Sequence, residues 1–513
     1  MDTKSQGPGA LSQRQLTGIR RGLEKESLRV QSDGKLAMTP HPAALGSALM
    51  HPHVTTDFCE SQLELITSVH SGVQDCIDEL TQIQLFTQKA LGDEMHWASS
   101  MPCGLPQDNE IPLGFYGSSN LGRTKTVYRS GLGYRYGRRM QTISGIHYNW
   151  SVPDLSSADY FALIRNFRRQ AFLLLYLFGA SPAVCSSFVA GRPHRLQELA
   201  PGTLHLPYAT SLRMGRLGYQ SDAQAELAVS YNSLAGYSAS LQTALTQPYP
   251  AYEAIGLKGP DGEYRQLQTT LLQIENEFYG TIRPKRVIAP GERPLHALRA
   301  RGVEYVEVRL MDLNPFEPVG ISSQTLRFLD VFLLHCVQQN SPYDTPSEIA
   351  ALARNQQRVA ESGREPGLLL ERGDGQITLT DWGLEIVAQL RPLAERLDAA
   401  HATQDYTRAV DTALNGLQHP ETLPSARVLE SMQRDFGGSF VSFVRARSQA
   451  NRSAMLKLAA DADGTSAQVL LAQQARQSVQ AQAELEASDS ISFDDYLAHY
   501  LSPQRLVSEV ELA

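Results

Sequence analysis

The segment RGLEKESLRV, residues 21–30, carries the pattern that decides the fold class. Successive side chains of a strand point to opposite sides, so Glu24 and Glu26 share one face if this segment is extended. Acidic residues are poor strand formers, and like charges repel across a strand face. The segment therefore predicts a strand whose paired acids need a compensating cation.

A second acidic segment follows, TTDFCESQLELIT at residues 55–67. Alternation places Glu60, Gln62 and Glu64 on one face. Asp57 has the opposite parity to Glu64, so the two can serve one site only through a bend or bulge between them.

Three more segments are predicted to be strands with polar side chains on one face. They are MQTISGIHYNWSV (140–152) with Gln141, Ile143, Gly145, His147, Asn149 and Ser151; QIENEFY (273–279) with Glu275 and Glu277; and VEYVEVRL (303–310) with Glu307 and Arg309. Any one acidic strand face is usually just solvated, and a single histidine is more often a hydrogen-bonded sheet residue than a ligand. Several such strands in one sheet would repel one another, and Mg²⁺, which takes oxygen ligands and accepts one histidine, would relieve that cost.

Cationic residues accompany the acids. RPKR, residues 283–286, directly follows the predicted Glu275/Glu277 strand, and Arg309 lies two residues beyond Glu307. Alone, RPKR would be a solvated surface turn. Arginine binds phosphate in a bidentate manner and lysine acts as a point charge, so acids for metals beside cations for phosphates suit Mg-ATP chemistry.

Composition limits the remaining choices. The chain has 513 residues, 42% of them hydrophobic, and a net charge of −8, which argues against binding nucleic acid through bulk charge. Five scattered cysteines without a C-x-x-C pair predict a reduced, cytoplasmic chain. The N-terminus lacks the apolar core of a signal peptide.

The uncharged stretch between Arg169 and Arg192 is long enough to span a bilayer. Only residues 171–178 are continuously apolar, so we expect a buried helix that stops at Gly179 and no membrane association.

The chain changes character near residue 345. Before it, short strand patterns alternate with helical patterns, and after it the sequence pattern is mostly helical. We predict an α+β protein with a sheet-and-helix catalytic body at residues 1–345 and a helical lobe packed on that body at residues 346–513.

Several motifs, in order, resemble the proteobacterial glutamate–cysteine ligase family. These are GIRRGLEKESLRV, HPHVTTDFCESQLELIT, RYGRRMQTISGIHYNWSVP, YLFGASPAVCSSF, LPYATSLRMGRLGY, LQIENEFYGTIRPKR and VEYVEVRLMDLNPF. The resemblance covers nearly the whole chain from about residue 18.

The resemblance implies a glutamine-synthetase-like fold, in which an antiparallel sheet forms a funnel with helices outside. It also implies an ATP-dependent reaction with Mg²⁺, or Mn²⁺ in its place. The γ-carboxylate of L-glutamate is phosphorylated, and the amine of L-cysteine then displaces phosphate to give γ-glutamylcysteine, the first step of glutathione biosynthesis.

Residue roles follow from the same resemblance. It implies that the Mg²⁺ ligands are Glu24, Glu26, Asp57, Glu64, His147 and Glu307, with Glu64 and Arg309 catalytic. It implies that Arg309, Lys285 and Arg283 contact the nucleotide phosphates. It implies that Arg213 binds the carboxylate of glutamate and that Phe58, Tyr128, Gln141, Ile143 and Tyr219 shape the substrate pocket. Each aromatic residue also has an ordinary reading as core packing, and Cys59 is expected to be a packing residue and not a nucleophile.

Three alternatives stay open at this point: a glutamate ligase that uses another amine, a metal-dependent phosphohydrolase, and a noncatalytic metal-stabilised protein. The sequence does not fix the oligomeric state.

Overall fold

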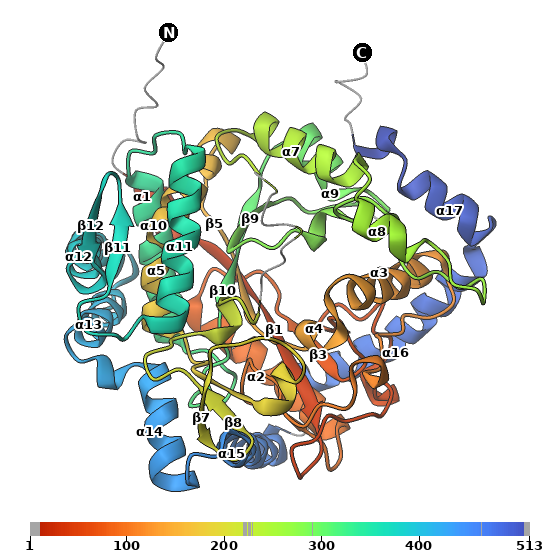
Figure 1. Cartoon of the computed structure of the whole chain (residues 1–513), viewed down its shortest axis with the longest axis horizontal. Coiled ribbons are helices and arrows are strands. Elements are labelled where there is room, and N and C mark those ends of the chain that lie inside the picture. Colours follow the sequence, from red (N-terminus) through yellow and green to blue (C-terminus); the bar gives the residue numbers. More distant parts are fainter. Residues whose placement is uncertain are drawn as a thin grey trace.

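The computed structural model describes residues 11–218, 223, 227, 229–289, 291–462 and 464–506. Its centre is a seven-stranded antiparallel sheet in the order β2-β3-β1-β5-β10-β9, with β4 paired to one end of β1 (Figure 1). The strands are β1 (Arg20–Val30), β2 (Val54–Thr56), β3 (Gln62–Ile66), β4 (Met95–His96), β5 (Ile146–Ser151), β9 (Ile282–Lys285) and β10 (Tyr305–Met311). The predicted α+β class with an antiparallel sheet is confirmed.

The strand register brings the polar side chains of separate segments onto one face, here called the polar face. Glu24 lies opposite His147, and Glu26 lies opposite Glu64. Glu307 lies opposite Asn149 on one side and Arg283 on the other.

One predicted strand is wrong. Residues Glu275–Glu277 form a single 3-10 turn, and each acid has its own arginine. Arg293 Nη2 lies 2.7 Å from Glu275 Oε2, and Arg135 Nη1 lies 3.0 Å from Glu277 Oε1. These two buried acids are neutralised by arginines far away in the sequence, which the E-x-E pattern does not reveal.

Helices cover the opposite face of the sheet. They include α2 (Val73–Ala90), α5 (Ser157–Phe178) and α10 (Ser323–Gln338). Helix α5 begins with a capping box in which Ser156 and Asp159 satisfy each other's backbone N–H groups, and it ends at Gly179 as expected. No helix within the described residues is long and apolar enough to cross a membrane.

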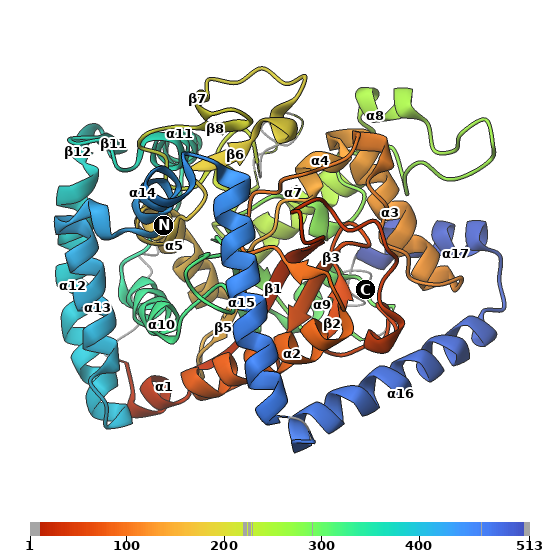
Figure 2. The ribbon, with the colours of Figure 1, turned by 90° about the horizontal axis from the view of Figure 1, so that it is seen from below.

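The part of the chain after residue 345 is mostly helical, as predicted. It contains α11 (Pro346–Ser362), α12 (Leu379–His401), α13 (Asp405–Gln418), α14 (Pro424–Phe436), α15 (Phe440–Ala462), α16 (Ser466–Ser488) and α17 (Phe493–Tyr500). Figure 2 shows α15 and α16 as two long rods, and both contact α2.

A small hairpin interrupts these helices. Strands β11 (Leu369–Arg372) and β12 (Gly375–Thr378) pair with each other in this part of the chain, which was predicted to be mostly helical. A division of the chain near residue 345 stays a prediction, and one hydrophobic cluster includes side chains from both sides of it, such as Leu329 and Leu390.

The expectation of a fully reduced chain is also wrong for this structure, in which Cys103 and Cys185 form a disulfide. Their Cα atoms are 5.4 Å apart although 82 residues separate them in the sequence. The fold, and not the local sequence, brings these two cysteines together. No short cysteine motif therefore predicts the pair. Cys59 is buried and free, and burial raises the pKa of its thiol to about 12, in keeping with a packing role.

Candidate active site

Three strands bring Glu24, Glu64 and His147 together on the polar face. One ligand atom from each side chain lies within 4.8 Å of the others. His147 Nδ1 is 3.0 Å from Glu24 Oε2, and the Asn149 amide donates to Glu24 Oε1 at 2.8 Å. The cluster follows directly from the pairing of β1 with β3 and β5.

Glu26 extends this cluster along β1. Its Oε2 accepts a hydrogen bond from the backbone N–H of Gly145 at 2.7 Å. Its Oε1 is buried without a hydrogen bond, as is His147 Nε2, and these two atoms are 3.4 Å apart. Two such buried polar atoms facing each other are unusual in a folded protein.

Asp57 reaches the cluster from outside the strands. It lies in the turn between β2 and β3, which supplies the bend that its parity required. Its backbone carbonyl accepts a hydrogen bond from the Arg129 guanidinium. Its carboxylate is close enough to act on the pKa of both Glu26 and Glu64.

Repulsion among these acids is visible in their proton affinities. Burial and then Asp57 raise the pKa of Glu26 to about 8. Burial, followed by Glu24 and Asp57, raises the pKa of Glu64 well above its ordinary value. This part of the face carries more buried carboxylate than the chain itself compensates.

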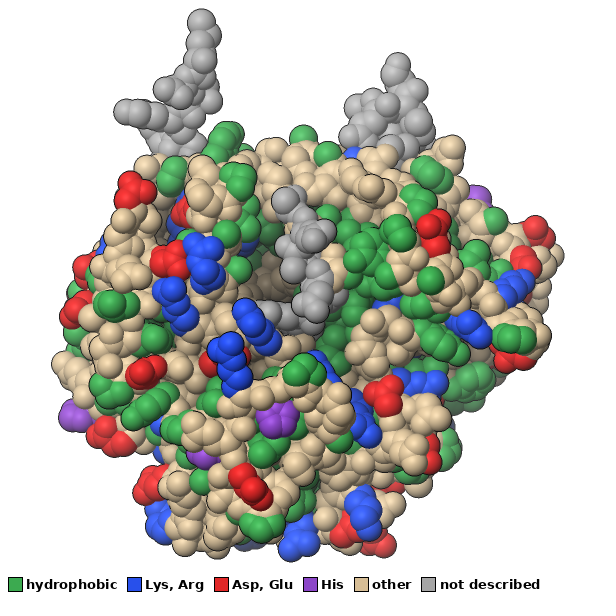
Figure 3. Space-filling model, viewed as in Figure 1, with side chains coloured by type: hydrophobic (Ala, Val, Ile, Leu, Met, Phe, Trp, Pro, Cys, Tyr) green, Lys and Arg blue, Asp and Glu red, His purple; other side chains and the backbone are tan. Residues whose placement is uncertain are grey.

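The other end of the polar face is cationic. Glu307 Oε1 is 3.0 Å from Lys285 Nζ, and Glu307 Oε2 is 2.9 Å from Arg309 Nη1 and 3.7 Å from Arg283 Nη1. Although burial acts in the opposite direction, Lys285 and Arg309 lower the pKa of Glu307 well below its ordinary value. Figure 3 shows a hollow in the molecule in the part of the view where Figure 1 labels β9 and β10.

The donor set on this face fits a divalent cation. Carboxylate oxygens with one imidazole are ligands that Mg²⁺ and Mn²⁺ accept. Burial and then Arg309 lower the pKa of His147, which favours the neutral ring that binds metals. A cation would also engage the buried Glu26 Oε1 and His147 Nε2 atoms and relieve the repulsion at Glu64.

Arg213 lies fully buried beside the site, in a 3-10 turn at Leu212–Met214. Its Nη2 donates to the Arg309 carbonyl at 2.8 Å, and its Nη1 is 3.7 Å from Asp312 Oδ1. A Cβ atom at Gly145 would come within 2.0 Å of the guanidinium, so a glycine is needed where β5 begins. The Arg213 side chain is thus held from two sides against the polar face.

The residues expected to shape the substrate pocket come from several elements. Phe58 is buried next to Asp57, and Tyr128 lies on α3 (Asn120–Tyr136). Gln141 ends α4 (Arg138–Gln141) and donates to the Tyr279 hydroxyl at 2.8 Å.

The structure describes only one of the two remaining pocket residues. Ile143 is buried, and its carbonyl accepts a hydrogen bond from the Gln62 side chain at 3.0 Å. Tyr219 lies outside the described residues. Gln141 and Ile143 were expected on the same strand as His147, but that strand begins only at Ile146.

Two residues near the site were not singled out from the sequence. Asp312 accepts hydrogen bonds from the Ser211 hydroxyl at 3.0 Å and the Ala180 N–H at 2.8 Å while it pairs with Arg213. Burial and then Arg129 lower the pKa of Lys125 to about 8, and Glu64 opposes them. The scarcity of lysine in this arginine-rich chain is a signal that could have drawn attention to Lys125.

The chain resembles known proteins over most of its length. The family model for glutamate-cysteine ligase matches residues 10–359. A glutamate–cysteine ligase of Saccharophagus degradans is 48% identical over 505 residues, with 94% of each chain covered. One of Alcanivorax borkumensis is 46% identical over 507 residues, covering 94% of this chain and 96% of that protein.

Solved structures agree with this match. The glutamate–cysteine ligase of Francisella tularensis, crystallised in complex with AMP, has a TM-score of 0.89 and 38% identity, with 94% of this chain and 98% of that chain covered. A bifunctional glutathione synthetase of Pasteurella multocida has a TM-score of 0.67 and 26% identity, with 86% of this chain and 53% of that chain covered. From the strand register to these relatives, the observations agree that the chain belongs to the glutamate–cysteine ligase family.

Proposed function

We propose that the polar face joins the γ-carboxyl group of L-glutamate to the amine of L-cysteine at the expense of ATP. A γ-carboxylate oxygen forms a bond to the terminal phosphorus of ATP, and the bond from that phosphorus to ADP breaks. The cysteine amine then bonds to the carbonyl carbon of the resulting acyl phosphate, phosphate leaves, and the nitrogen loses a proton. The product is γ-glutamylcysteine, which opens glutathione biosynthesis.

One observation carries this proposal: the polar face is divided by charge. Carboxylates dominate at β1 and β3, and three cations surround a single carboxylate, Glu307, at β9 and β10. A reaction between two anions, a carboxylate and a triphosphate, needs both kinds of group side by side. A phosphohydrolase would need only one anion binding site.

Glu24, Glu26, Asp57, Glu64, His147 and Glu307 are the residues that would hold Mg²⁺, or Mn²⁺ in its place. When bound, the metal would neutralise phosphate and carboxylate oxygens and so let the two anions approach. Glu64 would have a second, catalytic part in the proposal, because its negative charge would help to hold the ions next to the reacting groups.

Arg309, Lys285 and Arg283 bind the phosphate chain in this proposal. Arg309 approaches His147 Nδ1 to 3.4 Å, so its guanidinium lies where the acidic and cationic ends of the face meet. That position suits contact with the transferring phosphoryl group. The AMP carried by the Francisella tularensis relative is in keeping with nucleotide binding here.

Arg213 would bind the α-carboxylate of glutamate, and Asp312 would hold its guanidinium in place. Phe58, Tyr128, Gln141, Ile143 and Tyr219 would form the walls of the cysteine pocket, where apolar surface suits a small thiol side chain. ATP and both amino acids are small metabolites of the cytoplasm, which is where we place the enzyme.

Coupled detection of ADP tests the proposal. Release should need glutamate, cysteine and Mg²⁺ together, and EDTA should abolish it. ADP released equally with other amines would identify the broader glutamate ligase, and phosphate released without any amino acid would identify a phosphohydrolase. Glutamate labelled with ¹⁸O in the γ-carboxyl group should pass one label to the released phosphate, and unlabelled phosphate would contradict the acyl phosphate.

A further inference from the structure

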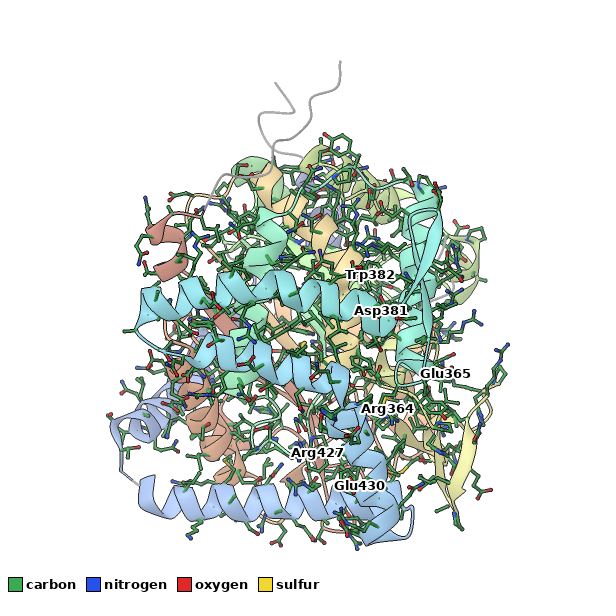
Figure 4. All side chains as sticks on the ribbon, turned by 90° about the vertical axis from the view of Figure 1, so that its left-hand side faces the viewer. Arg364, Glu365, Asp381, Trp382, Arg427 and Glu430 are labelled. Atoms are coloured by element: carbon green, nitrogen blue, oxygen red, sulfur yellow. A yellow bond between two sulfur atoms is a disulfide. The ribbon has the colours of Figure 1, made fainter. Side chains whose placement is uncertain are left out.

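A second cationic cavity lies outside the polar face. It has a volume of about 400 Å³ and is lined by residues of α14 and α15 and by Phe316, in the segment that follows β10. Figure 4 shows Arg427 and Glu430 on α14, away from the labelled residues Asp381 and Trp382 of α12. None of the described residues assigned above to metal, ATP, glutamate or cysteine lines this cavity.

The floor of the cavity is aromatic. The Phe316 and Phe443 rings are 5.9 Å apart between centroids, and the Phe443 and Phe436 rings are 5.8 Å apart. The Arg427 guanidinium lies 4.1 Å from the Phe316 ring centroid, and that of Arg447 lies 5.1 Å from it. Two cations therefore gather over one ring at the edge of an apolar surface.

The charges around the cavity are unequally matched. Arg434 forms ion pairs with both acids that line the cavity, at 3.1 Å from Glu430 and 2.8 Å from Asp435. Within the described residues, Arg427 and Arg447 form no ion pair with a carboxylate, and the Arg447 side chain donates a hydrogen bond to the Pro315 carbonyl at 2.9 Å.

The two unmatched arginines act on each other. Burial and the neighbouring Arg427 lower the pKa of Arg447, with Glu317 acting in the opposite direction. Like charges held together beside an empty volume are stabilised when an anion enters between them.

We propose that this cavity binds a small organic dianion, a phosphate monoester or a dicarboxylate, whose charged end contacts Arg427 and Arg447 and whose apolar end packs on Phe316, Phe436 and Phe443. Guanidinium groups recognise oxyanions with paired N–H groups, and the three rings supply surface that an inorganic ion cannot use. The volume suits a ligand of that size.

The cavity is connected to the polar face by the chain segment that contains Phe316. Phe316 is five residues beyond the end of β10, the strand that carries Glu307 and Arg309. The intervening segment is held by Asn314, whose side chain accepts from the Phe316 N–H at 3.1 Å and whose N–H donates to Gly320 at 2.8 Å. A ligand seated on Phe316 would contact a rigid turn directly attached to the site strand.

Calorimetric titration of the full chain with phenyl phosphate tests the proposal. We expect saturable binding that weakens about tenfold or more in Arg427→Gln and in Arg447→Gln, the usual consequence of losing a charge-assisted hydrogen bond. Arg445→Gln is the matched control, because it removes the same charge from an exposed position on α15 that does not line the cavity. Its affinity should equal that of the wild type.

Further titrations identify the ligand class. Phthalate binding with the same dependence on Arg427 would extend the class to dicarboxylates, and binding of phenyl phosphate alone would restrict it to phosphate esters. Inorganic phosphate that binds as tightly as phenyl phosphate would overturn the role of the aromatic floor. Unchanged phenyl phosphate affinity in Arg427→Gln would place all binding elsewhere and overturn the site, provided that ADP release with glutamate and cysteine shows the variant to be folded.

Discussion

Strands β1 and β5 bury charge on both of their faces, but in opposite ways. On the helix-covered face, the Asp330 carboxylate of α10 receives Arg21 at 3.0 Å, the Tyr148 hydroxyl at 2.7 Å and the Trp150 N–H at 3.1 Å. On the polar face, Glu24, Glu26 and Glu64 share one neutral histidine and repel one another. The first arrangement is complete in itself, and in our proposal the second is completed by bound metal ions and substrates.

The charged groups around Asp330 stabilise the fold, whereas we propose that those of the polar face serve the reaction. A carboxylate with a full set of partners stabilises one arrangement of the core. Carboxylates with raised pKa values destabilise the folded protein, and a bound cation would offset that destabilisation. Substitutions on the two faces should therefore have opposite consequences.

The largest effect is expected at Asp330. Asp330→Ala leaves the Arg21 guanidinium buried without its partner and should lower the free energy of unfolding by about 3–5 kcal/mol. Urea denaturation measures this loss. Asp411→Ala, at the exposed ion pair with Arg391, should cost less than about 1 kcal/mol. Equal losses in the two variants would contradict the claim that the buried Asp330 cluster stabilises the fold more than an exposed ion pair does.

Arg309 should matter for turnover and little for folding. Arg309→Lys keeps the charge but loses the planar fork, and kcat should fall about 10²- to 10³-fold while the KM for glutamate changes little. Steady-state ADP release checks this. Arg286→Lys is the control: Arg286 lies in the neighbouring RPKR segment but is directed to the Arg301 carbonyl and Glu304, so this variant should turn over like the wild type. Wild-type kcat in Arg309→Lys would refute the assignment.

Glu64 should behave in the opposite sense to Asp330. Burial and the neighbouring Glu24 and Asp57 raise the pKa of Glu64, so in metal-free protein at pH 8 Glu64→Gln removes the cost of burying this carboxyl group among other acids and should raise the free energy of unfolding. Denaturation in EDTA measures the gain, and Mg²⁺ should stabilise the variant less than the wild type. Destabilisation by Glu64→Gln in EDTA would contradict the repulsion.

Glu60 provides the matched control for that experiment. Its carboxylate lies a few residues away in the same segment but accepts the backbone N–H groups of His41 at 2.7 Å and Phe115 at 2.6 Å. Glu60→Gln should therefore destabilise the protein with or without Mg²⁺.

Local pattern was enough to predict the polar face. Period-two alternation identified β1, β3, β5 and β10, and the opposite parity of Asp57 predicted the bend that the turn after β2 provides. These features depend on neighbouring residues in the chain, so the sequence contains them directly.

Features that depend on long-range pairing were out of reach. The E-x-E pattern at Glu275 and Glu277 looks the same as that at Glu24 and Glu26, and only Arg293 and Arg135 distinguish them. The Cys103–Cys185 disulfide and the support of Arg213 by Asp312 also join segments that are distant in the sequence. Glu275 and Glu277 are each paired with an arginine, whereas Glu24 and Glu26 lie in the acidic cluster that we propose binds metal.

The pH dependence of stability with and without Mg²⁺ tests that account most directly. Burial and Asp57 raise the pKa of Glu26 from its ordinary value of 4.5 to about 8, so the folded metal-free protein holds a proton that the unfolded chain releases. Its free energy of unfolding should fall as the pH rises from about 4.5 towards 8 and should be restored by Mg²⁺ most strongly at the upper end of that range. Stability that is the same at pH 6 and pH 8 in EDTA, and unchanged by Mg²⁺, would contradict the account.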